Sequence, residues 1–227
     1  MKSCIDRFEF ESAILERGFS HIAGVDEAGR GPLAGPVVAV AAVLPLEWIR
    51  NGLPPELEGL NDSKQLTAAR REEFFSFLTN APPVRFAIGI IDAAAIDLLN
   101  ILQATHRAMA QALAALRPPP EHVLLDGLLV QSLRFPQTAL VKGDTRSYSI
   151  AAASVLAKVT RDRLMLEYDR QFPAYGFADH KGYGTARHLA ALARHGPCPI
   201  HRRSFAPVTQ PELDLFARLH SPAPGTF

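Results

Sequence analysis

The sequence has little cysteine and no apolar run long enough to cross a membrane. Its 227 residues include only two cysteines, Cys4 and Cys198, which are too few for a disulfide framework and have no metal-binding spacing. Such sparse cysteine is typical of proteins in a reducing compartment. The best candidate for an apolar run, from Val37 to Leu44, has only the length of a strand, so we expect no membrane-spanning helix.

The first residues also lack the pattern of a signal peptide. Met1–Arg7 mixes charges, and no unbroken apolar core follows Lys2. We therefore expect a cytoplasmic protein. With 48% hydrophobic residues the chain can bury a substantial core, and its length favours one domain with at most a small appendage.

The charge is nearly balanced but unevenly distributed. The formal net charge is +1, yet Val141–Arg203 contains 11 Lys and Arg against 5 Asp and Glu, which leaves 13 and 18 in the rest of the chain. A basic C-terminal third beside an acidic remainder is typical of a surface that binds a polyanion such as nucleic acid. Ordinary variation in surface charge explains the same numbers equally well.

Apolar periodicity predicts an α/β domain with a mixed central sheet flanked by helices. Short apolar runs predict strands at 21–26, 37–44, 84–91, 122–127 and 138–141, of which the first three can form hairpins. Helices are expected from Thr67 to the stop at Pro82, and at 92–116, 147–168, 185–195 and 211–219. The segment 45–61 is typical of a loop. The helix–strand alternation after the hairpins indicates a mixed sheet.

The same pattern divides the chain into four parts. We expect an N-terminal extension at 1–20, a catalytic domain at 21–170, a small C-terminal helical appendage at 171–220 and a flexible tail at 221–227.

Four acidic residues stand out by position, namely Asp26, Glu27, Asp126 and Asp144. Asp26 and Asp126 each end an apolar strand, and ligand sites in α/β sheets gather at such strand ends. Clustered carboxylates repel one another unless divalent cations lie between them, and oxygen ligands select Mg²⁺ or Mn²⁺ rather than zinc. The alternative is that these acids are helix caps and turn formers, and for Asp144, just before a helix, capping is a strong competitor.

A glycine-rich loop follows the first acidic pair. Gly29 and Gly31 flank Arg30, so the backbone here can approach a ligand closely and offer its N–H groups to a phosphate or a hydroxyl. The loop has no Gly-Lys-Ser/Thr ending and is therefore not a nucleotide-binding P-loop. A simple hairpin turn explains the same residues.

Taken together, the motifs resemble the bacterial ribonuclease HII family over nearly all of 21–207. They follow one another in the family's order, at Val25–Val38, Asn61–Leu66, Leu125–Gly127, Lys142–Asp144, Ser149–Asp162, His180–Thr185 and His201–Phe205. The resemblance implies a ribonuclease H-like fold. It also implies a metal-dependent endonuclease that cuts the RNA strand of RNA–DNA hybrids and cleaves at the 5′ side of ribonucleotides embedded in duplex DNA.

The resemblance also implies roles for individual residues. Asp26, Glu27, Asp126 and Asp144 match the catalytic carboxylates that hold two Mn²⁺ or Mg²⁺ ions. Gly29, Arg30 and Gly31 match the motif that reads the junction between a ribonucleotide and the next deoxynucleotide, and Tyr183 matches a tyrosine that stacks on the sugar there. Lys64 matches a residue that contacts phosphate. For Tyr183 alone, without the family, a packed loop tyrosine is the simpler interpretation.

For other basic residues and for His201 in these motifs, the sequence does not assign one role. Lys158, Arg161 and Arg163 lie on one predicted helix and can contact backbone phosphate or merely face solvent. His201 and Arg202 lie in a family motif whose chemistry suggests no function.

Two other functions fit parts of the pattern. The sister enzyme ribonuclease HIII shares the fold but carries an extra N-terminal domain, whereas here only about twenty residues precede the predicted catalytic domain. A catalytically silent nucleic-acid-binding protein would tolerate the loss of the four acids, all of which are present.

A short peptide near the C-terminus suggests a protein partner. Glu212–Phe216 resembles the Gln-Leu-Asp-Leu-Phe-type peptide by which bacterial replication proteins bind the sliding clamp, with Glu212 in place of the usual glutamine. Leu213, Phe216 and Leu219 could equally form one face of a helix that packs on the core.

Overall fold

The computed structural model describes residues 6–209, and its centre is one mixed five-stranded sheet. The strand order is β3-β2-β1-β4-β5, in which β1, β2 and β3 are antiparallel neighbours while β4 runs parallel to both β1 and β5. The strands are β1 (Ile22–Ala28), β2 (Val37–Val43), β3 (Arg85–Ile91), β4 (His122–Asp126) and β5 (Gln137–Leu140). The predicted mixed sheet is therefore confirmed; the first three strands are antiparallel neighbours, although α2, η1 and α3 separate β2 from β3 in the chain.

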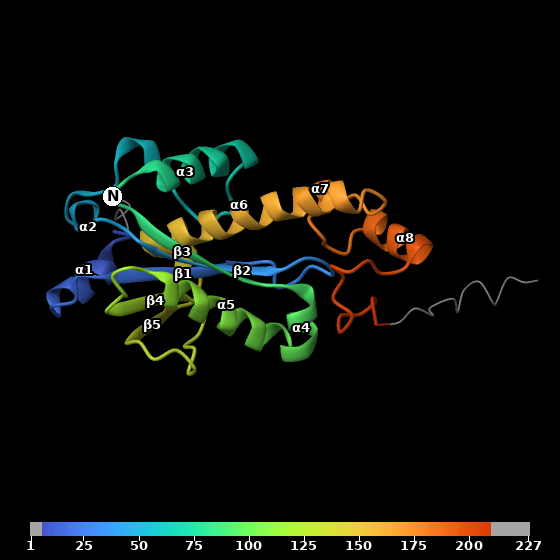
Figure 1. Cartoon of the computed structure of the whole chain (residues 1–227). Helices are drawn as coiled ribbons and strands as arrows, with labels where there is room; N and C mark the ends of the chain where they lie inside the picture. The colour runs from blue at the N-terminus through green and yellow to red at the C-terminus, as the bar shows by residue number, and fades with distance from the viewer. Residues whose placement is uncertain (1–5, 210–227) are drawn as a thin grey trace, which may run out of the picture.

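Helices cover both faces of the sheet, as Figure 1 shows. Helix α5 packs on one face with α4 beside it, and α6 packs on the other with α3 outside it. The helices are α1 (Glu9–Glu16), α2 (Leu46–Asn51), α3 (Ala68–Asn80), α4 (Ala93–Leu99), α5 (Ile101–Ala115), α6 (Tyr148–Gln171), α7 (Phe177–His180) and α8 (Ala186–His195), with short 3-10 turns η1 (Pro55–Leu57) and η2 (Gly143–Thr145).

Small residues let α6 lie very close to β1. A Cβ atom built on Gly24 would lie 2.1 Å from the carbonyl carbon of Ser149, so only glycine fits where the strand passes under the helix. The facing turn of α6, Ala151–Ser154, is buried and carries only small side chains. This contact brings the residues just before α6 to the level of Asp26, two residues beyond Gly24 on the same face of β1.

Two predicted boundaries are wrong. The helix expected at 92–116 is two helices, because Asn100 adopts a left-handed conformation (φ 66°) between α4 and α5. Asp92 caps only the first of them, by accepting a hydrogen bond from the N–H of Ala95, and Asn100 caps the second. The segment expected to be a loop, 45–61, contains α2 and η1, which are too short to produce a helical period in the sequence.

Two predictions fall beyond residue 209: the helix expected at 211–219 and the peptide Glu212–Phe216 lie outside the described residues.

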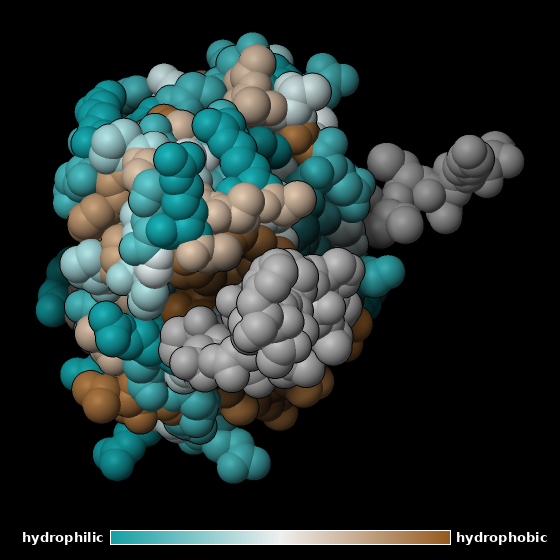
Figure 2. All heavy atoms as spheres, turned by 90° about the vertical axis from the view of Figure 1, so that its right-hand side faces the viewer, coloured by the Kyte–Doolittle hydropathy of each residue, from teal (hydrophilic) through white to brown (hydrophobic). Residues whose placement is uncertain are grey.

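Within 6–209 no helix has the length and apolar character needed to cross a membrane. Figure 2 looks at the end of the molecule that carries α8, where hydrophilic and apolar side chains are mixed.

Candidate active site

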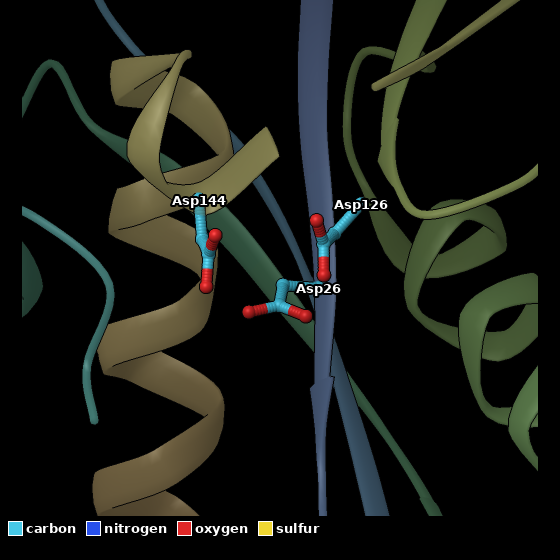
Figure 3. Close-up of side chains that lie close together, drawn as sticks. All are labelled: Asp26, Asp126 and Asp144. Carbon is cyan, nitrogen blue, oxygen red and sulfur yellow. The ribbon is translucent and has the colours of Figure 1, made fainter. Parts of the chain in front are cut away.

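Three aspartates from different segments meet on the α6 face of the sheet (Figure 3). Asp26 lies in β1 and Asp126 is the last residue of β4; the parallel register that pairs Val25 with Leu125 places them side by side. Asp144 lies in η2, immediately before α6. One carboxylate oxygen from each of the three lies within 4.8 Å of the others. The structure thus brings together three of the four acids singled out in the sequence, although β1 continues past Asp26 to Ala28.

Burial and mutual repulsion disfavour the charged forms of these acids. The pKa of Asp26 is well above its usual value, first because the group is buried and then because of the negative charges of Glu27 and Asp126. The pKa of Asp144 is raised to about 6 by burial, by Asp126 and by Asp62. Clustered carboxylates with raised pKa values are costly unless a positive charge is shared between them.

Asp144 is held in the cluster and does not cap the following helix. The cap of α6 is Ser147, whose hydroxyl accepts a hydrogen bond from the N–H of Ile150. The N–H of Gly143 donates to Oδ1 of Asp126 at 2.7 Å, which ties the η2 turn to the end of β4. The capping alternative for Asp144 is therefore wrong.

Glu27 lies outside the group of three aspartates, although its charge interacts with those of Asp26 and Asp126. Its carboxylate pairs with the guanidinium of Arg30 at 3.2 Å, and it is not part of the group within 4.8 Å. Burial raises the pKa of Glu27, which the charge of Arg30 opposes. The assignment of Glu27 as a metal ligand remains a proposal.

Lys64 lies within electrostatic reach of the acid cluster. Partial burial alone would lower the pKa of Lys64, but the surrounding negative charges outweigh this and raise it. Two neighbours that sequence reasoning left without a role contribute here. Asp62 accepts a hydrogen bond from the N–H of Lys64 at 2.8 Å, and Ser63 accepts one from the hydroxyl of Ser154 on α6 at 3.0 Å. The Asn61–Leu66 motif was their only signal.

The glycine loop and Tyr183 face one another beside the cluster. A Cβ atom on Gly31 would meet only the ring of Tyr183, at 3.8 Å, and Tyr183 is 45% exposed. The N–H of Leu33 donates to the carbonyl oxygen of Gly182 at 2.8 Å, which links the two loops. Tyr183 is therefore an accessible ring and not a packed core residue.

The three basic residues of α6 that were singled out in the sequence differ in their environments. Lys158 pairs with Asp162 at 2.7 Å, and Arg163 pairs with Glu72 of α3. Arg161 is only 1% exposed and neither contacts solvent nor can reach a phosphate. Both interpretations of Arg161 made from the sequence are therefore wrong, because it lies beneath the glycine loop.

The N-terminal segment supports the acid cluster, which the sequence did not predict. Arg7 donates to the carbonyl oxygens of Leu60 and Asp144, the latter at 2.7 Å. Glu11 of α1 is fully buried and accepts hydrogen bonds from the hydroxyl of Ser147 at 2.6 Å and from the N–H of Ser149 at 3.1 Å. A charged residue in a short amphipathic helix gives no sequence signal for such a role.

The donor set fits a hard divalent cation. The cluster offers carboxylate oxygens only, from the three buried or half-buried aspartates, and such ligands suit Mg²⁺ or Mn²⁺. The pKa values of Asp26 and Asp144 are raised first by burial and then by repulsion from neighbouring carboxylates, and a bound cation would relieve that repulsion.

Comparison with known proteins places the chain in a family. The family model described as ribonuclease HII matches residues 23–208. Ribonuclease HII of Geobacter metallireducens is 53% identical over 201 residues, which cover 88% of this chain and 91% of that protein. Ribonuclease HII of Geobacillus kaustophilus is 54% identical over 201 residues, or 88% of this chain and 74% of that protein.

Solved structures agree with this assignment. The ribonuclease H2 of Pyrococcus horikoshii has a TM-score of 0.69 at 28% identity, covering 84% of this chain and 96% of that one. The structure described as the PCNA:RNase HII complex from Archaeoglobus fulgidus has a TM-score of 0.63 at 25% identity, covering 81% and 94%. The fold, the three aspartates beside the glycine loop and these relatives lead to one conclusion: the chain belongs to the ribonuclease HII family and has its ribonuclease H-like fold.

Proposed function

We propose that this ribonuclease H, an endoribonuclease of RNA–DNA hybrids, also cleaves duplex DNA at the 5′ side of an embedded ribonucleotide, using divalent cations held by Asp26, Asp126 and Asp144. The observation that carries the proposal is the meeting of these three carboxylates within 4.8 Å, with Asp26 a few residues before a loop in which Arg30 and Gly31 are exposed. Family membership supports the enzyme class, and the two sequence relatives that are 53% and 54% identical are both named ribonuclease HII.

The residues divide the chemistry between them. Bound divalent cations, as a pair of Mg²⁺ or Mn²⁺ ions, would activate the attacking water and stabilise the leaving 3′ oxygen. The chain supplies the carboxylates that hold them, with Glu27 as the proposed fourth ligand. Lys64, whose pKa is raised by the acids around it, stays protonated and can contact a phosphate next to the cut. The expected products carry a 3′-hydroxyl and a 5′-phosphate.

The ribose is recognised by the glycine loop in this proposal. The 2′-hydroxyl is the group that separates RNA from DNA, and backbone groups of Gly29–Gly31 can test for it without reading a base. Tyr183, exposed and facing Gly31, can stack on the neighbouring sugar. Recognition by backbone and sugar contacts suits an enzyme without sequence preference.

Metal binding can be tested without measuring activity. Titration of the chelator-treated protein with Mn²⁺ should raise its melting temperature, because the ion binds the folded state alone. Asp126→Asn should lose most of this increase, and cleavage of an RNA–DNA hybrid with it. Asp179→Asn, at an exposed residue paired with Arg187, is the matched control and should respond as the unaltered protein does. Equal stabilisation of all three proteins would place the metal elsewhere.

The cytoplasmic location and the sliding-clamp partner belong to this proposal as well. The relative from Archaeoglobus fulgidus was solved in complex with PCNA, and Glu212–Phe216 of this chain resembles a clamp-binding peptide. Such a peptide binds through a few apolar anchors, here Leu215 and Phe216. Leu215→Ala/Phe216→Ala should therefore abolish binding to a bacterial clamp with nuclease activity unchanged, and Glu212→Gln should strengthen it. Absence of binding by the unaltered protein would contradict the partner.

A further inference from the structure

Two buried arginines lie beneath the glycine loop. Arg202 is 0% and Arg161 is 1% exposed. Among residues 6–209, no carboxylate lies within salt-bridge distance of either guanidinium. An unpaired buried charge is costly, so these two positions are held by something other than an ion pair.

Backbone carbonyls of the loop replace the missing carboxylates at Arg202. Its Nη2 donates to the carbonyl oxygen of Gly29 at 2.5 Å, its Nη1 to that of Arg30 at 2.9 Å and its Nε to that of Gly35 at 3.0 Å. The ring of Phe205 lies 5.1 Å from the guanidinium carbon. One planar fork thus holds both ends of the loop 29–35.

Arg161 holds the other side of the loop and joins it to the Tyr183 segment. It donates to the carbonyl oxygens of Ala34 and Lys181, both at 3.1 Å, and of Pro36 at 3.0 Å. A Cβ atom on Gly29 would lie 2.1 Å from Nε of Arg161, so the first glycine of the motif is needed for this arginine to fit.

The fork also fixes which way the loop amides point. The peptide bonds here are trans, so the C=O and N–H of each unit point in opposite directions. Because the carbonyls of Gly29 and Arg30 point down to Arg202, the N–H groups of Arg30 and Gly31 point away from it. No backbone acceptor for these two N–H groups is present in the described chain.

The buried charge also strengthens those amides as donors. Burial, and secondarily the nearby charge of Arg161, lowers the pKa of Arg202 to about 9, so the guanidinium remains protonated at neutral pH. A charged donor on a carbonyl polarises the peptide unit and makes its N–H a better donor, more so in a low-dielectric interior.

We propose that Arg202 is a positioning residue for ribose recognition: its guanidinium, bound to the carbonyls of Gly29, Arg30 and Gly35, aims the N–H groups of Arg30 and Gly31 at the 2′-hydroxyl. Arg202 itself does not touch the substrate. The inference rests on the proposed function of the loop and explains why a fully buried arginine occupies this position in place of an apolar residue.

The test measures whether a change at residue 202 and removal of the 2′-hydroxyl from the substrate have coupled effects, by combining each protein variant with each substrate. Single-turnover cleavage is measured on a DNA duplex with one ribonucleotide and on the same duplex with a 2′-fluoro ribonucleotide, which lacks the hydroxyl. Where the fluoro duplex is cut too slowly, its affinity is measured by competition. Arg202→Lys keeps the charge but replaces the fork by a point donor that cannot reach three carbonyls. Arg203→Lys, at the exposed next residue, is the matched control.

The expected result is a loss of discrimination and not only of rate. Arg202→Lys should reduce the preference for the ribonucleotide over its fluoro analogue by about fivefold or more, as expected when contacting groups are coupled. Arg203→Lys should keep the full preference. A folded Arg202→Lys protein with unchanged preference, even at a lower rate, would reduce Arg202 to a structural residue and overturn the proposal.

A second variant decides the matter if Arg202→Lys does not fold. Phe205→Leu removes the ring beside the guanidinium and leaves every hydrogen bond donor in place. It should lower the preference in the same direction by a smaller factor, and an unchanged preference overturns the proposal. Failure of the proposed function has a different result, because the unaltered enzyme would then not distinguish the two duplexes at all.

Discussion

The three aspartates of the acid cluster lie so close together that charging all of them is costly unless a cation is bound. Asp26 is buried beside Asp126, and Asp144 completes the group from the turn before α6. In the absence of a cation, burial and the neighbouring carboxylates raise the pKa values of Asp26 and Asp144, so the folded protein binds protons that the unfolded chain releases. The cluster therefore opposes folding at neutral pH unless a metal is bound.

The metal-free protein should lose stability as the pH rises. The pKa of Asp144 is about 6 in the folded state against an ordinary 3.8, so its favourable contribution is complete below about pH 4 and lost as the pH passes about 6. The melting temperature in chelator should fall between about pH 4 and 7 from this group. Asp144→Asn should flatten that part of the profile. Parallel profiles of melting temperature against pH for the two proteins would show that the pKa of Asp144 is not raised by folding.

Tyr183→Ala should slow cleavage at a single embedded ribonucleotide. Stacking on a sugar or base is worth about 1–3 kcal/mol, so the loss should be about tenfold or more. A continuous RNA–DNA hybrid offers other ribose contacts and should be affected less. Tyr183→Phe keeps the ring and should stay near the activity of the unaltered enzyme. Equal, small losses on both substrates with Tyr183→Ala would mean that the exposed ring has no substrate role.

At the scale of elements, all five strands were predictable, because each is a compact apolar run between turn residues. The strand pattern placed Asp26 and Asp126 at strand ends, whereas the parallel pairing of β1 with β4 that brings them together was known only from the structure. The break at Asn100 was not predictable, because it depends on one left-handed residue in an otherwise helical pattern. The roles of Arg161 and Arg202 were hidden as well, because burial of an arginine on carbonyls leaves no local signal.

Helix α1 should contribute to stability through one buried carboxylate. Glu11 accepts hydrogen bonds from Ser147 and from the N–H of Ser149 at the start of α6. Glu11→Ala leaves these donors buried without an acceptor, and we expect a loss of about 1–3 kcal/mol in the free energy of unfolding by urea. Glu16→Ala, at an exposed position of the same helix, should stay within about 0.5 kcal/mol. Similar values for both variants would contradict the role of α1.

At the scale of the whole molecule, helix α6 and the loops beside it bring three chain segments together on one face of the sheet. Helix α6 brings the Asp144 turn to β1, and the loops 29–36 and 181–183 are joined by Arg161 beside it. The aspartate cluster and the glycine loop are therefore held together by contacts between segments that lie far apart in the sequence. The division into 1–20, 21–170, 171–220 and 221–227 remains a prediction.

The most direct measurement is single-turnover cleavage of a DNA duplex that contains one ribonucleotide, with Mg²⁺ or Mn²⁺, and with both product ends identified. We expect one cut, at the 5′ side of the ribonucleotide, that leaves a 3′-hydroxyl and a 5′-phosphate. We expect no cut in the all-DNA duplex and no more than a few per cent of the activity for a folded Asp126→Asn protein, because the cluster loses a charged ligand. Cleavage by Asp126→Asn at the rate of the unaltered enzyme, or cleavage of the all-DNA duplex, would contradict the proposed function.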